Sequence, residues 1–155
     1  MATVTPPKKI NFQGIQVLIA APIANAGTAK YEPLMCLTSL SIDNGNRAEI
    51  DTTCAADTTK TFMFGLRDSA AITADGFYTP TEAGYVLAEA SFASNDAYLF
   101  RIIFPDAVTP STGKGTTKEF SGYVTSFSSN GAVDAVITAS IGIKASGDVT
   151  TTPAS

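Results

Sequence analysis

The sequence of 155 residues contains no histidine. This absence removes the most common general base, the usual nitrogen ligand of metal sites, and the Ser-His-Asp and Cys-His arrangements for nucleophilic catalysis. One carboxylate pair remains conceivable as an acid and a base, because strand alternation places Glu49 and Asp51 on the same face. Nothing apolar alternates with them to raise a pKa by burial, so a solvated strand face is the better interpretation. We therefore expect a protein without enzymatic activity, cofactor or metal.

Charged residues are scarce, since they make up 15% of the chain against about 25% in typical soluble domains. The formal net charge is −4, and the basic residues are scattered singly apart from Lys8-Lys9. That distribution leaves no footprint for the phosphates of nucleic acid. Ser, Thr, Gly and Ala must then cover much of the outside, and such a surface is suited to packing against further copies of the chain.

Cysteine is nearly absent, with Cys36 and Cys54 the only two. Two cysteines are too few for a disulfide framework and lack the spacing of metal ligands, so we expect two buried free thiols. No apolar run approaches the length of a transmembrane helix, about 18 residues. The apolar stretch after Lys8-Lys9 is interrupted by Gln16 and Pro22, so we expect no secretory signal.

The dominant positive signal is that of β-strands. Short runs rich in β-branched and aromatic residues predict strands at residues 15–20, 34–43, 47–53, 61–64, 70–78, 97–104, 116–129 and 132–144. Two dipeptides that tolerate positive φ, Asn44-Gly45 and Asn130-Gly131, predict two hairpins with two-residue turns. The register of the first hairpin places the thiols of Cys36 and Cys54 on opposite faces of the sheet, which argues against a disulfide between them.

The second predicted hairpin has a return strand with clear alternation. Small or polar residues alternate there with the apolar set Val133, Ala135, Ile137, Ala139, Ile141 and Ile143, which predicts one face toward a core and one polar face. The outgoing strand differs, because it carries large apolar residues on both faces. We interpret this as an interface on each side of that strand.

One helix is predicted between the strands. Thr79-Pro80-Thr81-Glu82 has the pattern of a capping box with proline at the first helical position, and the apolar stripe that follows consists of Ala83, Val86, Leu87 and Ala90. The helix should run to about Phe92. The whole pattern predicts a mainly β domain of two packed antiparallel sheets, as a sandwich or open barrel, with one flanking α-helix.

The two ends of the chain have little to bury, because residues 1–7 are short and proline-bearing and residues 145–155 are mostly Ser, Thr, Gly, Pro and Ala. We expect neighbouring subunits to hold one or both ends in place. The segment GKGTT at residues 113–117 resembles a fragment of a phosphate loop. It precedes a strand instead of a helix, so we do not assign phosphate binding to it.

Five segments, in this order, carry a resemblance to a known family. They are LTSLSIDNGNRAEID at residues 37–51, FGLRDS at 64–69, AITADGFY at 71–78, YLFRIIFP at 98–105 and FSGYVTS at 120–126. Together they resemble the major tail tube proteins of long-tailed, lambda-like bacteriophages, and the likeness spans about residues 37–144.

The resemblance implies a single tail tube domain over residues 1–155, with an N-terminal arm at 1–14 and a C-terminal tail at 145–155. It implies a structural subunit that forms hexameric rings, which stack into a hollow tube around the tape-measure protein and conduct DNA to the host cell without binding it specifically. The other implied partners are the tail terminator and the baseplate or tail-tip proteins, with no membrane. The expected location is the virion tail, after assembly in the host cytoplasm.

The resemblance also implies two functional surfaces. A long loop within residues 43–67, least patterned at 52–60, is expected to fold onto the adjacent ring, with the candidates Asp43, Arg47, Glu49, Asp51, Asp57 and Lys60. The lumen is expected to be lined from the polar face of the return strand and its surroundings, with the candidates Asp134, Thr138, Ser140 and Glu119. A position facing the outer solvent is the alternative for these four residues.

Two alternative functions stay open on the sequence alone. The tube protein of a related contractile injection or type VI secretion system would share the fold and the ring, and a sheath partner would distinguish it. A β-barrel small-molecule-binding protein would instead use the mixed strand faces to line an internal cavity, and it would be a monomer.

Overall fold

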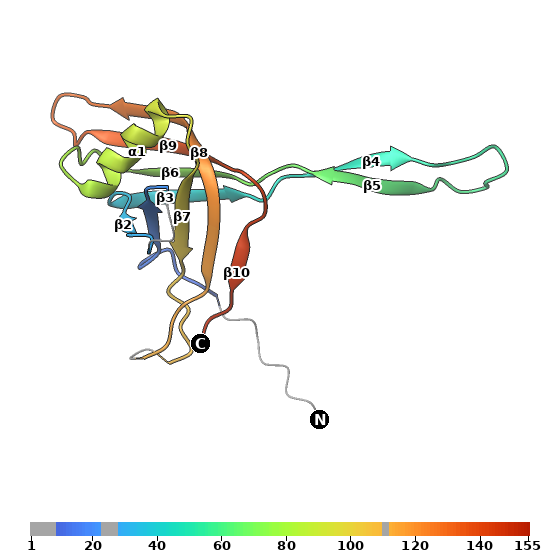
Figure 1. Cartoon of the computed structure of the whole chain (residues 1–155), viewed down its shortest axis with the longest axis horizontal. Helices are drawn as coiled ribbons and strands as arrows, with labels where there is room; N and C mark the ends of the chain where they lie inside the picture. The colour runs from blue at the N-terminus through green and yellow to red at the C-terminus, as the bar shows by residue number, and fades with distance from the viewer. Residues whose placement is uncertain (1–8, 23–27, 110–111) are drawn as a thin grey trace.

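The computed structural model describes residues 9–22, 28–109 and 112–155 of the chain. In this part it is mainly β, with an eight-stranded antiparallel sheet, a separate two-stranded sheet and one helix (Figure 1). The elements are β1 (Gln16–Ala20), β2 (Glu32–Pro33), β3 (Leu37–Asp43), β4 (Arg47–Asp51), β5 (Phe62–Arg67), β6 (Ala71–Phe77), α1 (Ala83–Ala93), β7 (Tyr98–Ile103), β8 (Thr117–Asn130), β9 (Thr138–Ala145) and β10 (Thr150–Thr152). The large sheet has the order β2-β1-β7-β8-β9-β6-β3, and β10 pairs with β8.

Strand β8 belongs to two layers of this sheet. Its first half pairs with β7 up to Gly122, its second half pairs with β9 from Gly122 to Asn130, and the register shifts between Val124 and Ser126. A shift of this kind bends a strand, so the sheet folds back on itself. We call the two halves the β7 layer (β2, β1, β7 and the start of β8) and the β9 layer (the end of β8, β9, β6 and β3). Their strands run in clearly different directions in Figure 1.

The core lies between the two layers. Phe100 and Ile102 of β7 are buried together with Ile141 and Ile143 of β9, and all four belong to one cluster. Burying a large apolar side chain stabilises the folded state by about 1.5–3 kcal/mol, so the contact between these inward-facing residues holds the two layers together. The predicted fold class, mainly β with two antiparallel sheets and one helix, is confirmed. The two packed layers, however, are halves of one sheet, and the second sheet projects away from the body (Figure 1).

Helix α1 closes one side of the core, but with a different face from the one predicted. The residues turned inward are Gly84, Tyr85, Ala88 and Ser91, whereas Val86 of the predicted stripe is half exposed. The reason is a close backbone contact, since a Cβ at Gly84 would lie 1.7 Å from the carbonyl oxygen of Pro33. Small inward residues let the helix approach the backbone at this point, and that geometry outweighs the hydrophobic stripe.

The predicted capping box at Thr79 is also wrong. The N-cap is Glu82, which has extended backbone angles and no side-chain cap bond. The amide of Glu82 donates to the carbonyl of Thr79 at 3.1 Å, so residues 79–82 form a turn ahead of the helix. The end of the helix at Ala93 agrees with the prediction of about Phe92.

The two Asn-Gly dipeptides behave differently from each other. Asn44-Gly45 does not form a hairpin turn, because β3 pairs with β6 and β4 pairs with β5. Gly45 has φ +75° and stands at a corner where a Cβ would lie 2.4 Å from the carbonyl oxygen of Asp68. At Asn130 the predicted hairpin does form, but its loop spans residues 131–137 and Asn130 pairs with Thr138. Strand β9 therefore begins at Thr138, and Val133, Ala135 and Ile137 are not strand residues.

Both cysteines are free, but both are exposed, so the prediction of buried thiols is wrong. Cys36 immediately precedes β3, and Cys54 lies in the loop beyond β4, where no core covers it. The C-terminal tail also differs from expectation. Strand β10 pairs with β8 of the same chain, and the amide of Ser155 donates to the carbonyl of Lys114, so this tail is ordered without a neighbour. Residues 1–7 lie outside the described residues.

Candidate assembly surfaces

The outward side of the β9 layer is built mostly from small polar residues. Neighbouring strands place them in three rows, which we call the polar face: Ser39, Asp75, Ser140 and Ser128; Ser41, Thr73, Gly142 and Ser126; Asp43, Ala71, Lys144 and Tyr123. The alternate residues of the same strands point into the core. The sheet therefore has one face packed on the core and one exposed to solvent, as is common for antiparallel sheets.

The polar face carries few charges. In its three rows the charged residues are Asp43, Asp75 and Lys144. The carboxylate of Asp75 accepts a hydrogen bond from Ser39 Oγ at 2.9 Å, and that of Asp43 accepts one from the Gly45 amide at 2.9 Å. The face consequently offers hydroxyl groups and partly satisfied carboxylates, with little attraction for a polyanion.

The structure brings together two of the four predicted lumen residues. Thr138 and Ser140 lie on β9, with Ser140 in the first row of the polar face. Asp134 lies in the loop 131–137 with φ 63°, off the strand, because β9 starts later than predicted. Glu119 lies on the first half of β8, in the β7 layer, because β8 changes layer beyond it.

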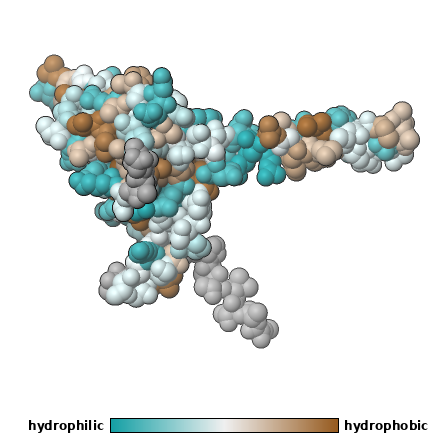
Figure 2. Space-filling view, in the orientation of Figure 1, coloured by the Kyte–Doolittle hydropathy of each residue, from teal (hydrophilic) through white to brown (hydrophobic). Residues whose placement is uncertain are grey.

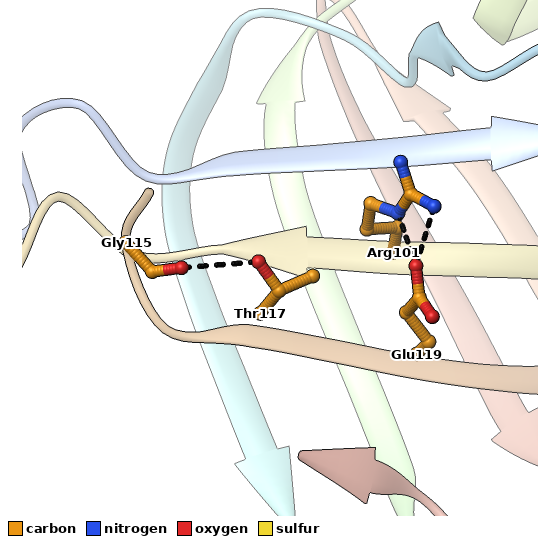
Figure 3. A network of polar contacts seen from close by, with 4 residues as sticks. All are labelled: Arg101, Gly115, Thr117 and Glu119. Atoms are coloured by element: carbon orange, nitrogen blue, oxygen red, sulfur yellow. Dashed lines mark hydrogen bonds and ion pairs between the residues drawn. The ribbon is translucent and has the colours of Figure 1, made fainter. Parts of the chain in front are cut away.

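Glu119, which was predicted as a lumen residue, forms an ion pair within the β7 layer. Its carboxylate accepts from the guanidinium of Arg101 on the neighbouring strand β7, and this guanidinium lies 4.0 Å from the ring centroid of Tyr31. Figure 3 shows this pair beside the bond that Thr117 Oγ1 donates to the carbonyl of Gly115. Both charged side chains are partly exposed, and such pairs contribute about 0–1 kcal/mol. The pair therefore joins β7 to β8 locally.

The GKGTT segment binds its own chain. The carboxylate of Asp106 accepts from the amide of Thr116 at 2.6 Å and from its hydroxyl at 2.5 Å. The amide nitrogen that a phosphate would need is thus occupied, and the segment leads into strand β8. The Thr116 amide is therefore not free to bind a phosphate.

A hairpin of β4 and β5, which we call the arm, projects far from the body (Figure 1). Its apolar side chains are exposed on both faces: Ile50 stands opposite Met63 on one, and Phe62 and Phe64 lie on the other. Leu66, near the base, is 92% exposed. An isolated two-stranded hairpin is at best marginally stable in water. The arm is therefore a candidate assembly surface, because its apolar side chains are left uncovered by the described residues.

The predicted inter-ring residues follow the length of the arm. Asp43 ends β3 at its base, Arg47, Glu49 and Asp51 lie on β4, and Asp57 and Lys60 lie in the loop between β4 and β5. The long loop that the resemblance implied within residues 43–67 thus contains two strands, in agreement with the strand patterns at residues 47–53 and 61–64. The strongest sequence signal for a covered surface here is the apolar run Phe62-Met63-Phe64-Gly65-Leu66. A strand without alternation has to be covered on both faces.

The carboxylates near the end of the arm are held in the ionised form. Hydrogen bonds from the side chain and the backbone amide of Thr53 lower the pKa of Asp51. The backbone amide and the thiol of Cys54 lower the pKa of Asp57. A carboxylic general acid needs a raised pKa, so the direction at Asp51 runs against the proposed pairing with Glu49. The described residues also contain no group of three or more His, Cys, Asp or Glu that could hold a metal ion.

An internal ligand cavity does not account for the mixed faces of β8. Phe127 on the second half of β8 packs edge-on against Tyr85 of α1 at 5.0 Å and lies near Phe92, so the helix covers it. A hollow of about 640 Å³ lies on the outside of the core, between α1 and residues 21–22 and 28–32. Helix α1, the only helix in the described ranges, is too short to cross a membrane.

Comparison with known proteins gives a match over nearly the whole chain. The family described as "Phage tail tube, TTP, lambda-like" matches residues 8–155. No curated protein matches the chain by sequence.

Three solved structures illustrate the likeness in fold. The tail of an empty gene transfer agent particle with C6 symmetry is 19% identical over 88% of this chain and 95% of that one, with a TM-score of 0.67. The SPP1 tail tube is 15% identical over 94% and 80%, with a TM-score of 0.71. The sheath-tube complex of the extracellular contractile injection system PVC is 16% identical over 97% and 94%, with a TM-score of 0.69.

Proposed function

Because the chain belongs to the lambda-like phage tail tube family, we propose that six copies of it close into a ring and that these rings stack into a hollow tube. The tail of the gene transfer agent particle, which shares the fold, has C6 symmetry. The protein is then a structural component of the virion tail that performs no catalysis and is assembled in the host cytoplasm.

The polar face supports an assignment as the wall of the lumen, and it is the observation that carries this proposal. A wall of serine and threonine hydroxyls with two carboxylates and only one lysine, Lys144, gives the DNA backbone few cationic partners, so a polyanion passes without being held. Thr138 and Ser140 face the lumen in this arrangement. Asp134 and Glu119 lie off the polar face and are not assigned to it.

Free strand edges support the closure of the ring. Strand β3 ends the order of the large sheet on one side, so its outer edge has no strand partner within the described residues. An unpaired edge invites pairing with another chain, and closure around an axis satisfies every copy in the same way. In the ring, the outer edge of β3 pairs with a neighbouring copy.

The arm supports contact between rings. Its apolar residues are covered when it lies on the adjacent ring, and Asp43, Arg47, Glu49, Asp51, Asp57 and Lys60 then contribute polar contacts around them. The remaining partners in this proposal are the tape-measure protein inside the tube, the terminator at one end and the baseplate or tail-tip proteins at the other.

A second candidate is the tube of a contractile injection system, which the likeness to the PVC sheath-tube complex favours. The two functions differ in one partner, because a contractile system surrounds its tube with a sheath. Co-purification of a sheath protein with the assembled tube would support the second candidate.

Electron microscopy of the full-length protein, expressed with its tape-measure and tail-tip partners, tests the proposal. We expect hollow tubes or rings with six-fold symmetry. A protein that stays monomeric at high concentration in the presence of these partners would contradict it.

A further inference from the structure

We propose that the loop between β8 and β9, residues 131–137, seats in a hollow at the base of the arm of another copy, in the next ring. This inference rests on the proposed function and names the two surfaces through which successive rings meet beside the lumen.

The loop is an exposed apolar tip. Val133 is 93% exposed, Val136 is 68% exposed, and Ile137 is about half exposed. The loop is nevertheless held in shape, because the carbonyl of Ile137 accepts from the amide of Tyr78 at 2.9 Å and that of Ala132 accepts from Ala135 at 3.3 Å. An ordered loop that exposes valine to water is suited to insertion into a matching hollow.

The hollow lies where the arm joins the body. Its volume is about 520 Å³, and its lining consists of Leu66, Arg67, Asp68, Ser69, Gly147 and Asp148. Leu66 supplies an apolar wall that is almost fully exposed. The hollow has room for the two or three side chains at the tip of a loop.

Strand register places the loop and the hollow at opposite ends of the β9 layer. The row Asp43, Ala71 and Lys144 marks the end near the arm, and the pair Phe77 and Thr138 marks the other end. Figure 1 shows the arm and the β8–β9 connection on opposite sides of the body, and Figure 2 shows hydrophobic atoms in both places. Complementary surfaces at opposite ends of a subunit join copies head to tail, and this contact can repeat into an open stack. If both surfaces lay at the same end of the subunit, two copies would form a closed pair.

The charges at the two surfaces favour a second copy as the occupant. Arg47 and Arg67 stand opposite each other in the arm, and like charges in that position repel. Asp148 lies 3.6 Å from Arg67, and Asp68 adds a second carboxylate to the lining. Arg47 stands beside this lining, 5.9 Å from the centroid of the Phe64 ring, and has no ion-pair partner among the described residues. Asp134, at the tip of the loop, brings a carboxylate to Arg47 when the loop seats in the hollow.

Disulfide trapping in assembled tubes tests the contact. In a background with Cys36→Ser and Cys54→Ser, the chain carrying both Leu66→Cys and Val133→Cys should give a ladder of covalent oligomers on oxidation. Each single variant should stay monomeric on a non-reducing gel, and a mixture of the two single variants should give dimers only. The matched control replaces Leu66→Cys by Met63→Cys, which is exposed farther along the arm and should not crosslink to Val133→Cys.

A charge reversal gives a second readout. Asp134→Arg should reduce the yield of tubes at least tenfold, and adding Arg47→Asp should restore most of it. Tubes that form normally but give no ladder from the 66–133 pair, or a ladder from the 63–133 pair instead, would overturn this inference and leave the proposed function standing. Failure of the parent protein to form rings or tubes would overturn both.

Discussion

At the scale of single residues, Tyr85 combines complete burial with an unsatisfied group. Its ring lies edge-on to Tyr78 at 5.2 Å and to Phe127 at 5.0 Å, which fixes α1 against the β9 layer. Its hydroxyl is buried and has no hydrogen-bond partner among the residues that the structure describes. Burial, followed by the charges of Tyr78 and Glu89, raises the pKa of Tyr85 to about 12. The ring thus contributes to packing while the hydroxyl opposes it.

Replacing Tyr85 by phenylalanine should keep the packing and remove the unsatisfied hydroxyl. We expect the free energy of unfolding to stay the same or rise by about 1 kcal/mol. The raised pKa favours the protonated form in the folded state, so the wild type should lose stability between about pH 10 and pH 12, and Tyr85→Phe should lose less. Urea unfolding at pH 7 and pH 11 measures both effects. Tyr123→Phe, at an exposed position, is the control and should change neither; a loss above 1 kcal/mol for Tyr85→Phe would contradict the assignment.

At the scale of elements, the arm is the part of the protein that its own fold does not explain. The body has a shared core, whereas β4 and β5 pair with each other and expose Phe62, Met63 and Phe64. Substitutions on the arm should therefore separate folding from assembly. That separation distinguishes a docking element from a part of the core.

The double substitution Phe62→Ser and Phe64→Ser should leave the free energy of unfolding of the subunit within about 0.5 kcal/mol, as is usual for exposed sites. The same variant should fail to form tubes, because the apolar contact with the next ring is lost. Calorimetry and electron microscopy measure the two effects. Val108→Ser, at an exposed apolar position away from the arm, is the matched control and should form tubes. Normal tubes from the double variant would show that the arm does not join rings.

The elements also show which features of the fold could be predicted from the sequence and which could not. Alternation on the last part of the predicted return strand correctly predicted that Ile141 and Ile143 of β9 face the core, because pleating alone decides this. Asn44-Gly45 correctly marked a positive φ at Gly45, but Asn44 has none and the partner of β3 is β6, far along the chain. Turn chemistry is local and does not specify a distant partner. The inward face of α1 likewise depends on the backbone of Pro33, which no helical pattern reveals.

At the scale of the whole molecule, the family was predicted from five sequence segments and their order along the chain, and the match over residues 8–155 confirms it. The assembly surfaces were only partly predictable. Two lumen candidates lie together on β9, but the complete polar face combines four strands whose register depends on the bend in β8. The hollow at the base of the arm likewise combines residues 66–69 with residues 147–148. Such surfaces come from tertiary pairing.

The lumen assignment predicts a difference in chemical access on assembly. In the background without Cys36 and Cys54, Ser140→Cys should react with a bulky polyethylene glycol maleimide at least ten times more slowly in tubes than in the free subunit. Ser121→Cys, a serine of similar exposure on the outward side of the β7 layer, should react at a similar rate in both. Gel shifts over time measure the rates. Protection of position 121 with free reaction at position 140 would reverse the assignment of the two layers.

The bend in β8 has a mechanical consequence for a conduit. If the β9 layer lines the lumen as proposed, force that cargo exerts on it would reach the β7 layer through the covalent backbone of this one strand, since the two halves of β8 belong to the two layers. Covalent bonds do not slide, whereas side-chain packing between two separate sheets could shear. The shared strand would therefore resist sliding of one layer over the other within a subunit.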